Sequence, residues 1–245
     1  ACLQMCPFKA LSVAGSNTET ALETVTLPHA PEVIDVPPAD SFRRPPRLSL
    51  AIRGVGGQGN LFFGKVLAQV AFLAGYDDRN ILKGETHGMA QMGGPVISTF
   101  GCGEVFSPAL VPGTANVLIA MEKAAVRRPG FLDLLEPGGT VLMADTRILP
   151  HGLKPEAYPS DEAIAAQLEG YRVVSVDVLS IALNLGDPKG RCANVAMLGV
   201  LSTLPPFDVV PEAVWLQALR GISRKPALWD LNHAAFMAGR GMQKG

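Results

Sequence analysis

Apolar and polar positions change their pattern at Leu48, where an irregular segment gives way to short apolar runs alternating with stretches of helical spacing. The runs predict strands at residues 48–55, 77–82, 95–106, 116–121, 139–145 and 171–177. The stretches predict helices at residues 59–76, 129–139, 160–170, 211–222 and 228–240. This alternation predicts an α/β fold: a Rossmann-like, three-layer, mostly parallel sheet with a helical C-terminal portion.

Glycine and proline refine this outline. Gly101 and Gly103 flank a cysteine inside the 95–106 run, which predicts a hairpin or a bulge there. Residues 12–47 are rich in Pro, Ser, Thr and Glu, and prolines deny the backbone donors and helical freedom. We therefore expect a Pro-rich linker over 12–47 and a single Rossmann-like domain over 48–245.

Composition limits the classes of function. Of the 245 residues 48% are hydrophobic and 18% are charged, and a mean hydropathy of +0.24 favours a surface that a partner subunit covers. A net charge of −1 gives no field for collecting phosphates, so nucleic acid is not expected as a partner. No apolar run is long enough for a membrane span, no signal peptide is evident, and four cysteines suit a reducing compartment, so we expect a cytoplasmic hetero-oligomer.

The segment "GVGGQGN" lies between the first predicted strand and helix, with glycines at 54, 56 and 59. Glycines at this spacing allow a tight turn, and the helix N-terminus then offers free N–H groups to an anion. Candidate ligand-binding residues are Gly54, Gly56, Gly57, Gln58 and Gly59. The alternative is that these glycines only let the helix cross closely over the strand.

The same glycine spacing occurs in NAD(P)-binding dehydrogenases, which use an acidic residue about 20 positions further on to bind the ribose. Asp77 and Asp78 are near that distance, and Glu85 is further along. The aspartates fall at a predicted helix-to-strand turn, not at the end of the second strand. A self-sufficient dehydrogenase is therefore the alternative function.

Residues 84–96, "GETHGMAQMGGPV", form a predicted loop after the second strand. His87 is its only group that titrates near neutral pH, and it is the candidate catalytic residue, with Glu85 as a potential acid/base partner. In an open parallel sheet such a loop lies beside the ligand crevice. A histidine that only caps backbone carbonyl groups is the alternative.

Together "GVGGQGN", "LAGYDD" and "ETHGMAQMGGPVIS", followed by "ANVLIAMEKAAVRR" and "NVAMLGVLS", resemble the gamma-type domain of the 2-oxoacid:acceptor (ferredoxin) oxidoreductases, and most of all the indolepyruvate oxidoreductase beta subunit. The resemblance covers about residues 48–240. It implies an enzyme that decarboxylates a 2-oxoacid on thiamine diphosphate and passes electrons through [4Fe-4S] clusters to ferredoxin or another acceptor.

The resemblance also implies a division of labour. Thiamine diphosphate belongs to a thiamine-binding catalytic subunit, and the gamma-type domain covers it and in some relatives contributes to a coenzyme A site. The chain alone is then expected to be inactive, and a ligand-free scaffold subunit remains an alternative. Many relatives carry Arg where this chain has Met92, so an anion contact from that position is not expected here.

The segment "CLQMCPFKAL" near the N-terminus has the Cys-x3-Cys-Pro spacing that ends a bacterial ferredoxin cluster run. Cys2 and Cys6 would be the last two ligands, and the first two are missing from this sequence. We interpret residues 1–11 as the remnant of a ferredoxin-like module, with coincidence as the alternative. Cys2 and Cys6 are metal ligands only if the rest of that module is present.

Other reactive side chains give weaker signals. Cys102 and Cys192 are predicted to be structural, although a helix dipole would lower the pKa of Cys192. Arg127 and Arg128 could face a nucleotide phosphate, although a solvated helix end is the usual place for such a pair.

Overall fold

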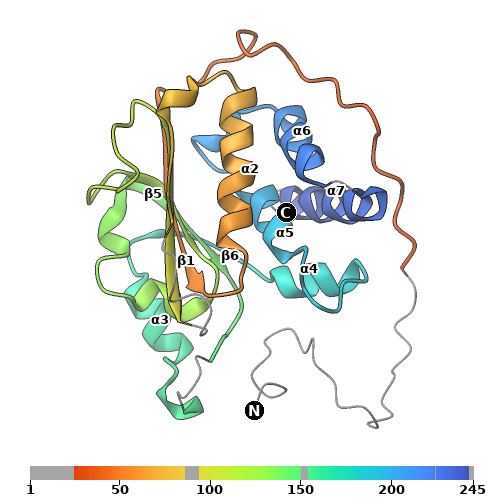
Figure 1. Ribbon diagram of the computed structural model, residues 1–245. Helices are drawn as coiled ribbons and strands as arrows, with labels where there is room; N and C mark the ends of the chain where they lie inside the picture. The colour runs from red at the N-terminus through yellow and green to blue at the C-terminus, as the bar shows by residue number, and fades with distance from the viewer. Residues whose placement is uncertain (1–24, 86–93, 150–153, 224, 243–245) are drawn as a thin grey trace.

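The computed structural model describes residues 25–85, 94–149, 154–223 and 225–242. A six-stranded sheet in the order β2-β3-β1-β4-β5-β6 forms the centre of the molecule (Figure 1). The strands are β1 (Arg47–Val55), β2 (Ile81–Glu85), β3 (Pro95–Gly103), β4 (Ala115–Ala120), β5 (Leu135–Ala144) and β6 (Arg172–Val176). Only β3 is antiparallel to its neighbours, β1 and β2, while β1, β4, β5 and β6 pair in parallel. The predicted mostly parallel sheet is therefore confirmed.

Helices cover the two faces unequally, as Figure 1 shows. One face carries α2 (Asn60–Leu73), α4 (Val178–Asn184), α5 (Ala193–Leu201), α6 (Glu212–Ile222) and α7 (Pro226–Gly241). The other carries α3 (Asp161–Gln167) and the short 3-10 helices Lys123–Arg127 and Leu132–Leu134. The first face holds the larger core, and the helical C-terminal portion supplies about half of the buried residues in it.

Helix α5 lies innermost in that larger core. Eight of its nine residues are buried, so a helix that is apolar on all sides is accommodated only because other helices surround it. Gly199 on α5 touches the backbone of Phe236 on α7, and Gly239 touches the backbone of Ala196, so a Cβ at either glycine would overlap a carbonyl oxygen. The exception on α5 is Asn194, which stays partly exposed at the start of the helix.

Residues 25–46, called here the proline-rich strap, have no helix or strand, as the prolines predict. The strap nevertheless follows the helical layer and makes specific contacts with it (Figure 1). The Ala30 N–H donates to Asp230 Oδ1 at 2.9 Å, and the Tyr76 hydroxyl donates to the Pro45 carbonyl at 2.7 Å. The division of the chain into remnant, linker and domain remains a prediction.

Three predicted elements differ from the structure. The break at residues 101–103 was wrong, because β3 continues to Gly103 while Cys102 is buried in the larger core. The helix over 129–139 was wrong: a turn and one short 3-10 helix lead directly into β5. The strand over 77–82 begins only at Ile81, after the 3-10 helix Asp78–Asn80.

Candidate ligand site at the glycine turn

The glycine turn joins the carboxyl end of β1 to α2. Gly57 and Gly59 have φ angles of 96° and 82°, values that favour glycine over every residue with a Cβ. Gly59 directly precedes α2, and no side chain caps the helix and no acidic residue lies in its first turn. The N-terminal N–H groups of this 14-residue helix are therefore left without a side-chain acceptor.

Gln58 closes the turn from inside the protein. Its side chain is buried, Oε1 accepts from the Val55 N–H at 2.7 Å, and Nε2 donates to the Met121 carbonyl at 2.6 Å. Gly54 makes room for this arrangement, since a Cβ there would lie 2.5 Å from Gln58 Oε1. Gln58 thus ties the end of β1 to the end of β4, and both polar atoms of its side chain have partners within the protein.

Asn60, the first residue of α2, behaves in the opposite way. It is 7% exposed, and neither Nδ2 nor Oδ1 has a hydrogen-bond partner among the described residues. A buried amide without partners costs roughly 1 to 3 kcal/mol. Such a cost at a helix N-terminus is the expected signature of a group that a ligand satisfies.

A second asparagine reaches the same corner from the other end of the domain. The side chain of Asn194, at the start of α5, lies against Gly59, where a Cβ would overlap its Nδ2. The starts of α2 and α5 therefore meet at the glycine turn. Sequence analysis missed Asn60 and Asn194, and the available signal was an asparagine in the first turn of each of two predicted helices.

The loop that carries His87 begins and ends at this same edge. Glu85 is the last residue of β2, Gly94 accepts a hydrogen bond from the Gly56 N–H at 3.0 Å, and Pro95 pairs with Val55. His87 itself lies outside the described residues, so its catalytic role stays a prediction. The predicted neighbourhood of the loop ends and the glycine turn agrees with the structure.

The aspartates considered for a ribose contact lie elsewhere. Asp77 follows the C-terminal end of α2, about 20 Å along a 14-residue helix from the glycine turn. Its carboxylate accepts from Arg79 at 2.6 Å, an interaction that lowers the pKa of Asp77. Glu85 at the end of β2 is closer to the start of α2, since a Cβ at Gly64 would lie 3.5 Å from its Oε1, but β3 separates β2 from β1. The place of Asp77 and the strand order argue against a dinucleotide site of the dehydrogenase type.

Both described cysteines are buried. Burial raises the pKa of Cys102 to about 12. Burial, with Asp187 as the next cause, also raises the pKa of Cys192 to about 12, so the predicted lowering by the helix dipole was wrong. In the described part of the chain no three His, Cys, Asp or Glu residues gather as a metal site. Cys2 and Cys6 lie outside the described residues.

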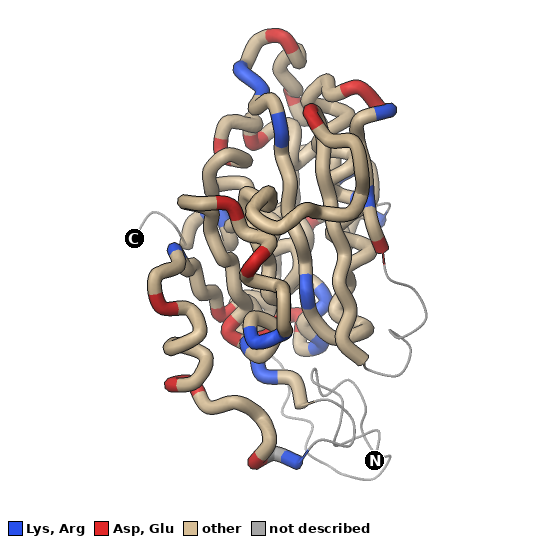
Figure 2. Tube along the Cα trace, turned by 90° about the vertical axis from the view of Figure 1, so that its left-hand side faces the viewer, with Lys and Arg blue, Asp and Glu red and all other residues tan. Residues whose placement is uncertain are grey.

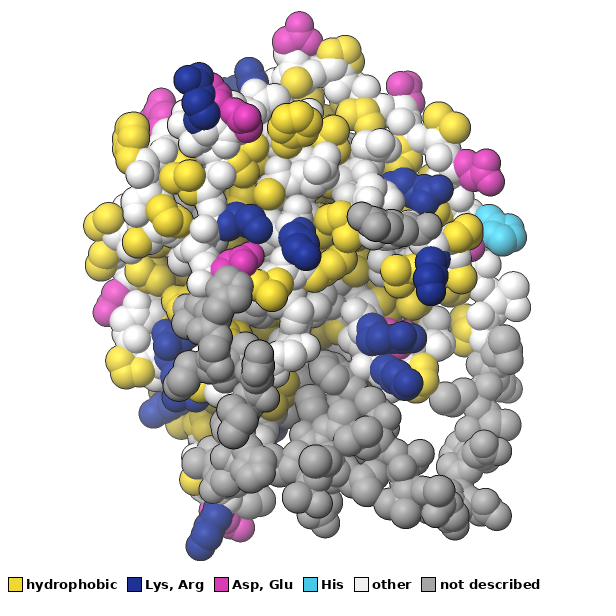
Figure 3. Space-filling view, in the orientation of Figure 1, with side chains coloured by type: hydrophobic (Ala, Val, Ile, Leu, Met, Phe, Trp, Pro, Cys, Tyr) yellow, Lys and Arg dark blue, Asp and Glu magenta, His cyan; other side chains and the backbone are white. Residues whose placement is uncertain are grey.

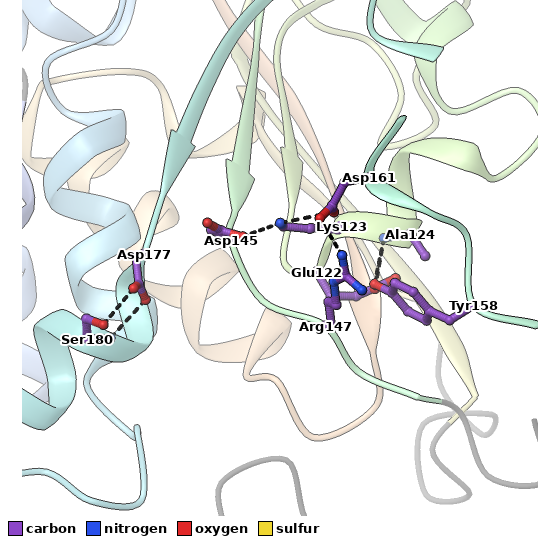
Figure 4. A network of polar contacts seen from close by, with 9 residues as sticks. All are labelled: Glu122, Lys123, Ala124, Asp145, Arg147, Tyr158, Asp161, Asp177 and Ser180. Carbon is purple, nitrogen blue, oxygen red and sulfur yellow. Dashed lines mark hydrogen bonds and ion pairs between the residues drawn. The ribbon is translucent and has the colours of Figure 1, made fainter. Parts of the chain in front are cut away.

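A polar network occupies the same edge of the sheet beyond β4 and β5 (Figure 4). The Tyr158 hydroxyl donates to Glu122 Oε2 at 2.6 Å, and the Ala124 N–H donates to the same oxygen at 2.9 Å. Burial raises the pKa of Glu122, and these hydrogen bonds oppose that shift in part.

Lys123 extends this network toward α3. Its Nζ lies 2.5 Å from Asp145 and 3.3 Å from Asp161, the first residue of α3, which also pairs with Arg147. The network thus fastens α3 to the ends of β4 and β5, and it has a structural role that needs no ligand.

Sequence comparison then identifies the family. A family model described as pyruvate ferredoxin/flavodoxin oxidoreductase matches residues 49–242, which is most of the chain. The chain belongs to this family.

Known members and structures agree with that assignment. The chain is 32% identical over 197 residues to the indolepyruvate oxidoreductase subunit IorB of Thermococcus kodakarensis, covering 78% of this chain and 93% of the relative. Its fold is similar to pyruvate oxidoreductase subunit PORC of Thermotoga maritima, with a TM-score of 0.59, 19% identity, and coverage of 80% and 97%. It is also similar to part of the 2-oxoglutarate:ferredoxin oxidoreductase of Magnetococcus marinus, solved with 2-oxoglutarate, coenzyme A and succinyl-CoA, with a TM-score of 0.58 and 19% identity. The latter match covers 82% of this chain and 32% of that one.

Membership in the pyruvate ferredoxin/flavodoxin oxidoreductase family confirms the resemblance drawn from the glycine and histidine motifs. It also confirms the expected α/β fold class and an enzymatic role as part of a 2-oxoacid oxidoreductase complex. In the described ranges, no helix combines the length and apolar character needed to cross a membrane.

Proposed function

We propose that this chain is the subunit without thiamine in a thiamine diphosphate-dependent 2-oxoacid oxidoreductase. Its substrate is an indolepyruvate- or arylglyoxylate-like 2-oxoacid, which the assembled complex decarboxylates oxidatively in the cytoplasm. The name of the Thermococcus relative, an indolepyruvate oxidoreductase subunit, supports an aryl-substituted substrate. Thiamine diphosphate, bound mainly by a partner subunit, supplies the carbanion chemistry of the decarboxylation.

Within that complex, the glycine turn binds an anionic group of a cofactor, and coenzyme A is the candidate. The observation that carries this proposal is the buried, unpaired amide of Asn60 at the uncapped start of α2. A phosphate there would accept from helix N–H groups and from Asn60 Nδ2, in the field of the helix dipole. Gly57 fits the same role, because a Cβ at this glycine would meet no atom of the described residues within 4 Å.

Electrons leave the complex through [4Fe-4S] clusters to ferredoxin or another acceptor. The Cys2 and Cys6 spacing supports a ferredoxin-like module ahead of the strap, either as part of a longer chain or as a remnant. The partners of this hetero-oligomer are therefore a thiamine-binding catalytic subunit and an iron–sulfur electron carrier.

Purification from the native host tests the assembly. Mass spectrometry of the co-purifying chains is expected to find a thiamine-binding subunit, and the complex should reduce a dye with a 2-oxoacid. The isolated chain should reduce none. Dye reduction by the isolated chain, or a native preparation without any thiamine-binding partner, would contradict the proposal.

Two substitutions test the coenzyme site within the assembled enzyme. Gly57→Ala and Asn60→Ala are expected to raise the KM for coenzyme A about tenfold, which corresponds to roughly 1.4 kcal/mol of binding. Asn232→Ala is the matched control, since Asn232 is a buried asparagine far along the chain that bonds Ser223 Oγ at 2.8 Å. An unchanged KM in both turn variants would reject coenzyme A binding at the turn.

A scaffold subunit without a ligand is the second candidate, and the internal bonds of Gln58 favour it. In that case, Gly57→Ala should alter assembly and leave the KM for coenzyme A unchanged. The dehydrogenase alternative predicts a saturable nicotinamide dinucleotide signal with the isolated chain. We expect none, because Asp77 and Asp78 lie beyond the C-terminal end of α2, away from the turn, and β3 separates β2 from β1.

A further inference from the structure

Arg53 is an unusual residue for its position in the sheet. Among the four parallel strands β1, β4, β5 and β6, it is the only charged residue outside the first two positions of a strand. Charged positions otherwise lie mainly on loops and helices (Figure 2). Its side chain points to the face opposite α2, where its guanidinium lies 5.7 Å from the ring centre of the fully buried Phe131.

The Nε of Arg53 is buried and has no hydrogen-bond partner among the described residues, and no described carboxylate forms an ion pair with the guanidinium. The stacking on Phe131 supplies one favourable contact but gives the Nε–H no acceptor. A partly buried arginine normally has a carboxylate or carbonyl acceptor, and the Nε–H of Arg53 lacks one among the described residues.

A second arginine is fixed beside the first by a tight turn. Arg128-Pro129-Gly130-Phe131 has the sequence of a type II turn, Gly130 has φ 75°, and the Phe131 N–H donates to the Arg128 carbonyl at 3.1 Å. The first and last residues of such a turn lie within about 7 Å of each other. Since Arg53 covers Phe131, the turn brings the backbone of Arg128 into the same neighbourhood, and the charge of Arg128 acts on Arg53.

The two positive charges repel each other. Burial lowers the pKa of Arg53, and the Arg128 charge lowers it further. Glu122 interacts with Arg128, since the Arg128 charge lowers the pKa of Glu122, but its carboxyl also accepts hydrogen bonds from Tyr158 and the Ala124 N–H. Arg128 also lines a pocket of about 400 Å³, together with Arg127, Glu122 and Tyr158.

We propose that Arg53 and Arg128 form a binding site for an anionic oxygen group, a carboxylate or a phosphate, whose remaining atoms extend into the adjoining pocket. Arg53 directly precedes Gly54 of the glycine turn, but its side chain lies on the face of the sheet opposite α2. Guanidinium forks match the geometry of both oxyanions, and a bound anion would remove the like-charge repulsion.

Anion titrations of the full chain, with the subunits that co-purify with it, test the proposal. Inorganic phosphate and malonate are each titrated at constant ionic strength, with the Nε–H NMR signal of Arg53 and calorimetry as readouts. Saturable binding of at least one anion that shifts the Arg53 signal is expected. Phosphate binding without malonate binding would assign a phosphate ligand, and the reverse result a carboxylate. No saturable shift with either anion would overturn the proposal.

Matched variants locate the site. Arg53→Gln and Arg128→Gln should each weaken anion binding at least tenfold. Arg79→Gln should leave it unchanged, because Arg79 is exposed, pairs with Asp77 at 2.6 Å and lies beyond the C-terminal end of α2. Asn60→Ala should also leave it unchanged, which separates this site from the glycine turn. An equal loss in Arg79→Gln would reduce the site to general surface charge and overturn the assignment.

A stability measurement distinguishes anion binding by Arg53 from a purely structural role of this residue. Without an added anion, Arg53→Gln should be as stable as the wild type or more stable, since it removes an uncompensated charge beside another. Clear destabilisation of Arg53→Gln together with unchanged anion binding would show that Arg53 only supports packing on Phe131.

Discussion

The glycine turn and the Glu122–Lys123 network lie at the same edge of one sheet, but only the network provides hydrogen-bond or ion-pair partners for its polar side chains. At the turn, the Asn60 amide is buried without partners and α2 has no cap. In the network, Glu122 accepts two hydrogen bonds and Lys123 has two carboxylate partners. A buried polar group therefore does not by itself indicate a ligand site at this edge. A buried polar group without a hydrogen-bond partner does.

The presence or absence of hydrogen-bond partners also decides how each region affects the stability of the free chain. Unsatisfied groups at the turn reduce the stability of the free chain and become useful only when something binds. Satisfied groups in the network stabilise α3 against the sheet (Figure 4). Substitutions at the two regions should consequently change different observables.

The largest effect on stability is expected inside the glycine turn itself. Gly59→Ala should cost about 3 kcal/mol, because it combines a left-handed backbone angle with overlap against Asn194. Gly57→Ala, with a similar angle and open space around it, should cost only about 1 kcal/mol. Urea unfolding of both variants measures the contrast. Equal costs would show that the turn is not closed against Asn194.

Removal of one hydroxyl from the network should have the next largest effect. Tyr158→Phe deprives buried Glu122 of its 2.6 Å donor and should cost about 2 kcal/mol in the free energy of unfolding. Tyr171→Phe, at a 39% exposed tyrosine, should change it by less than about 0.5 kcal/mol. If both variants unfold alike, the network does not stabilise the fold.

Two of the buried asparagines, Asn60 and Asn232, should lose different amounts of stability on truncation. Asn232→Ala loses a hydrogen bond to Ser223 and should cost about 1 kcal/mol, whereas Asn60→Ala removes an unsatisfied amide and should cost less than about 0.5 kcal/mol. Chemical denaturation without ligand measures both. A large loss in Asn60→Ala would reveal a structural partner and undermine the proposed coenzyme site.

The smallest expected change concerns pH. Burial raises the pKa of Glu122 in the folded chain above its value in the unfolded chain. The contribution of Glu122 to the free energy of unfolding is therefore fully present at pH values below its pKa in the unfolded chain, and it is lost as pH rises through its pKa in the folded chain. Glu122→Gln should remove that decline and be relatively more stable above this interval. Thermal unfolding from pH 4 to pH 8 compares the slopes, and parallel curves would contradict the assignment.

The sequence was most informative where local signals agreed. The strand, glycine turn and helix from Arg47 to Leu73 follow from an apolar run, special backbone angles and helical spacing, all within one segment. Prediction failed where local and long-range forces competed. Gly101 suggests a break, but it lies inside a paired strand and leaves room for Val105, which a Cβ there would approach to 3.1 Å.

The candidate site could be predicted only in part. The glycines identify the turn, but the approach of Asn194 depends on how α5 packs under α2, and the strand order that separates β1 from β2 is a long-range property. The apolar run before β5 was taken as helical, whereas the Pro129-Gly130 pair makes a turn that positions Arg128 and Phe131. That pair was the overlooked local signal.

Exposed apolar side chains do not indicate where a partner subunit binds. In the face shown in Figure 3 they are spread among charged groups instead of forming one large patch. Leu61 and Phe72 on α2, for example, are 47% and 59% exposed and lie at opposite ends of the helix.

The N-terminal end of the strap is held against the helical layer of the domain. Val25 lies beside Gly186, just after α4, and the Trp229 indole donates to the Pro31 carbonyl at 3.0 Å. The first described residue of the strap is therefore anchored beside α4, and the strap is held again at α7, before it reaches the first residue of β1. Any group attached at residue 25 has its point of attachment on the helical flank of the domain.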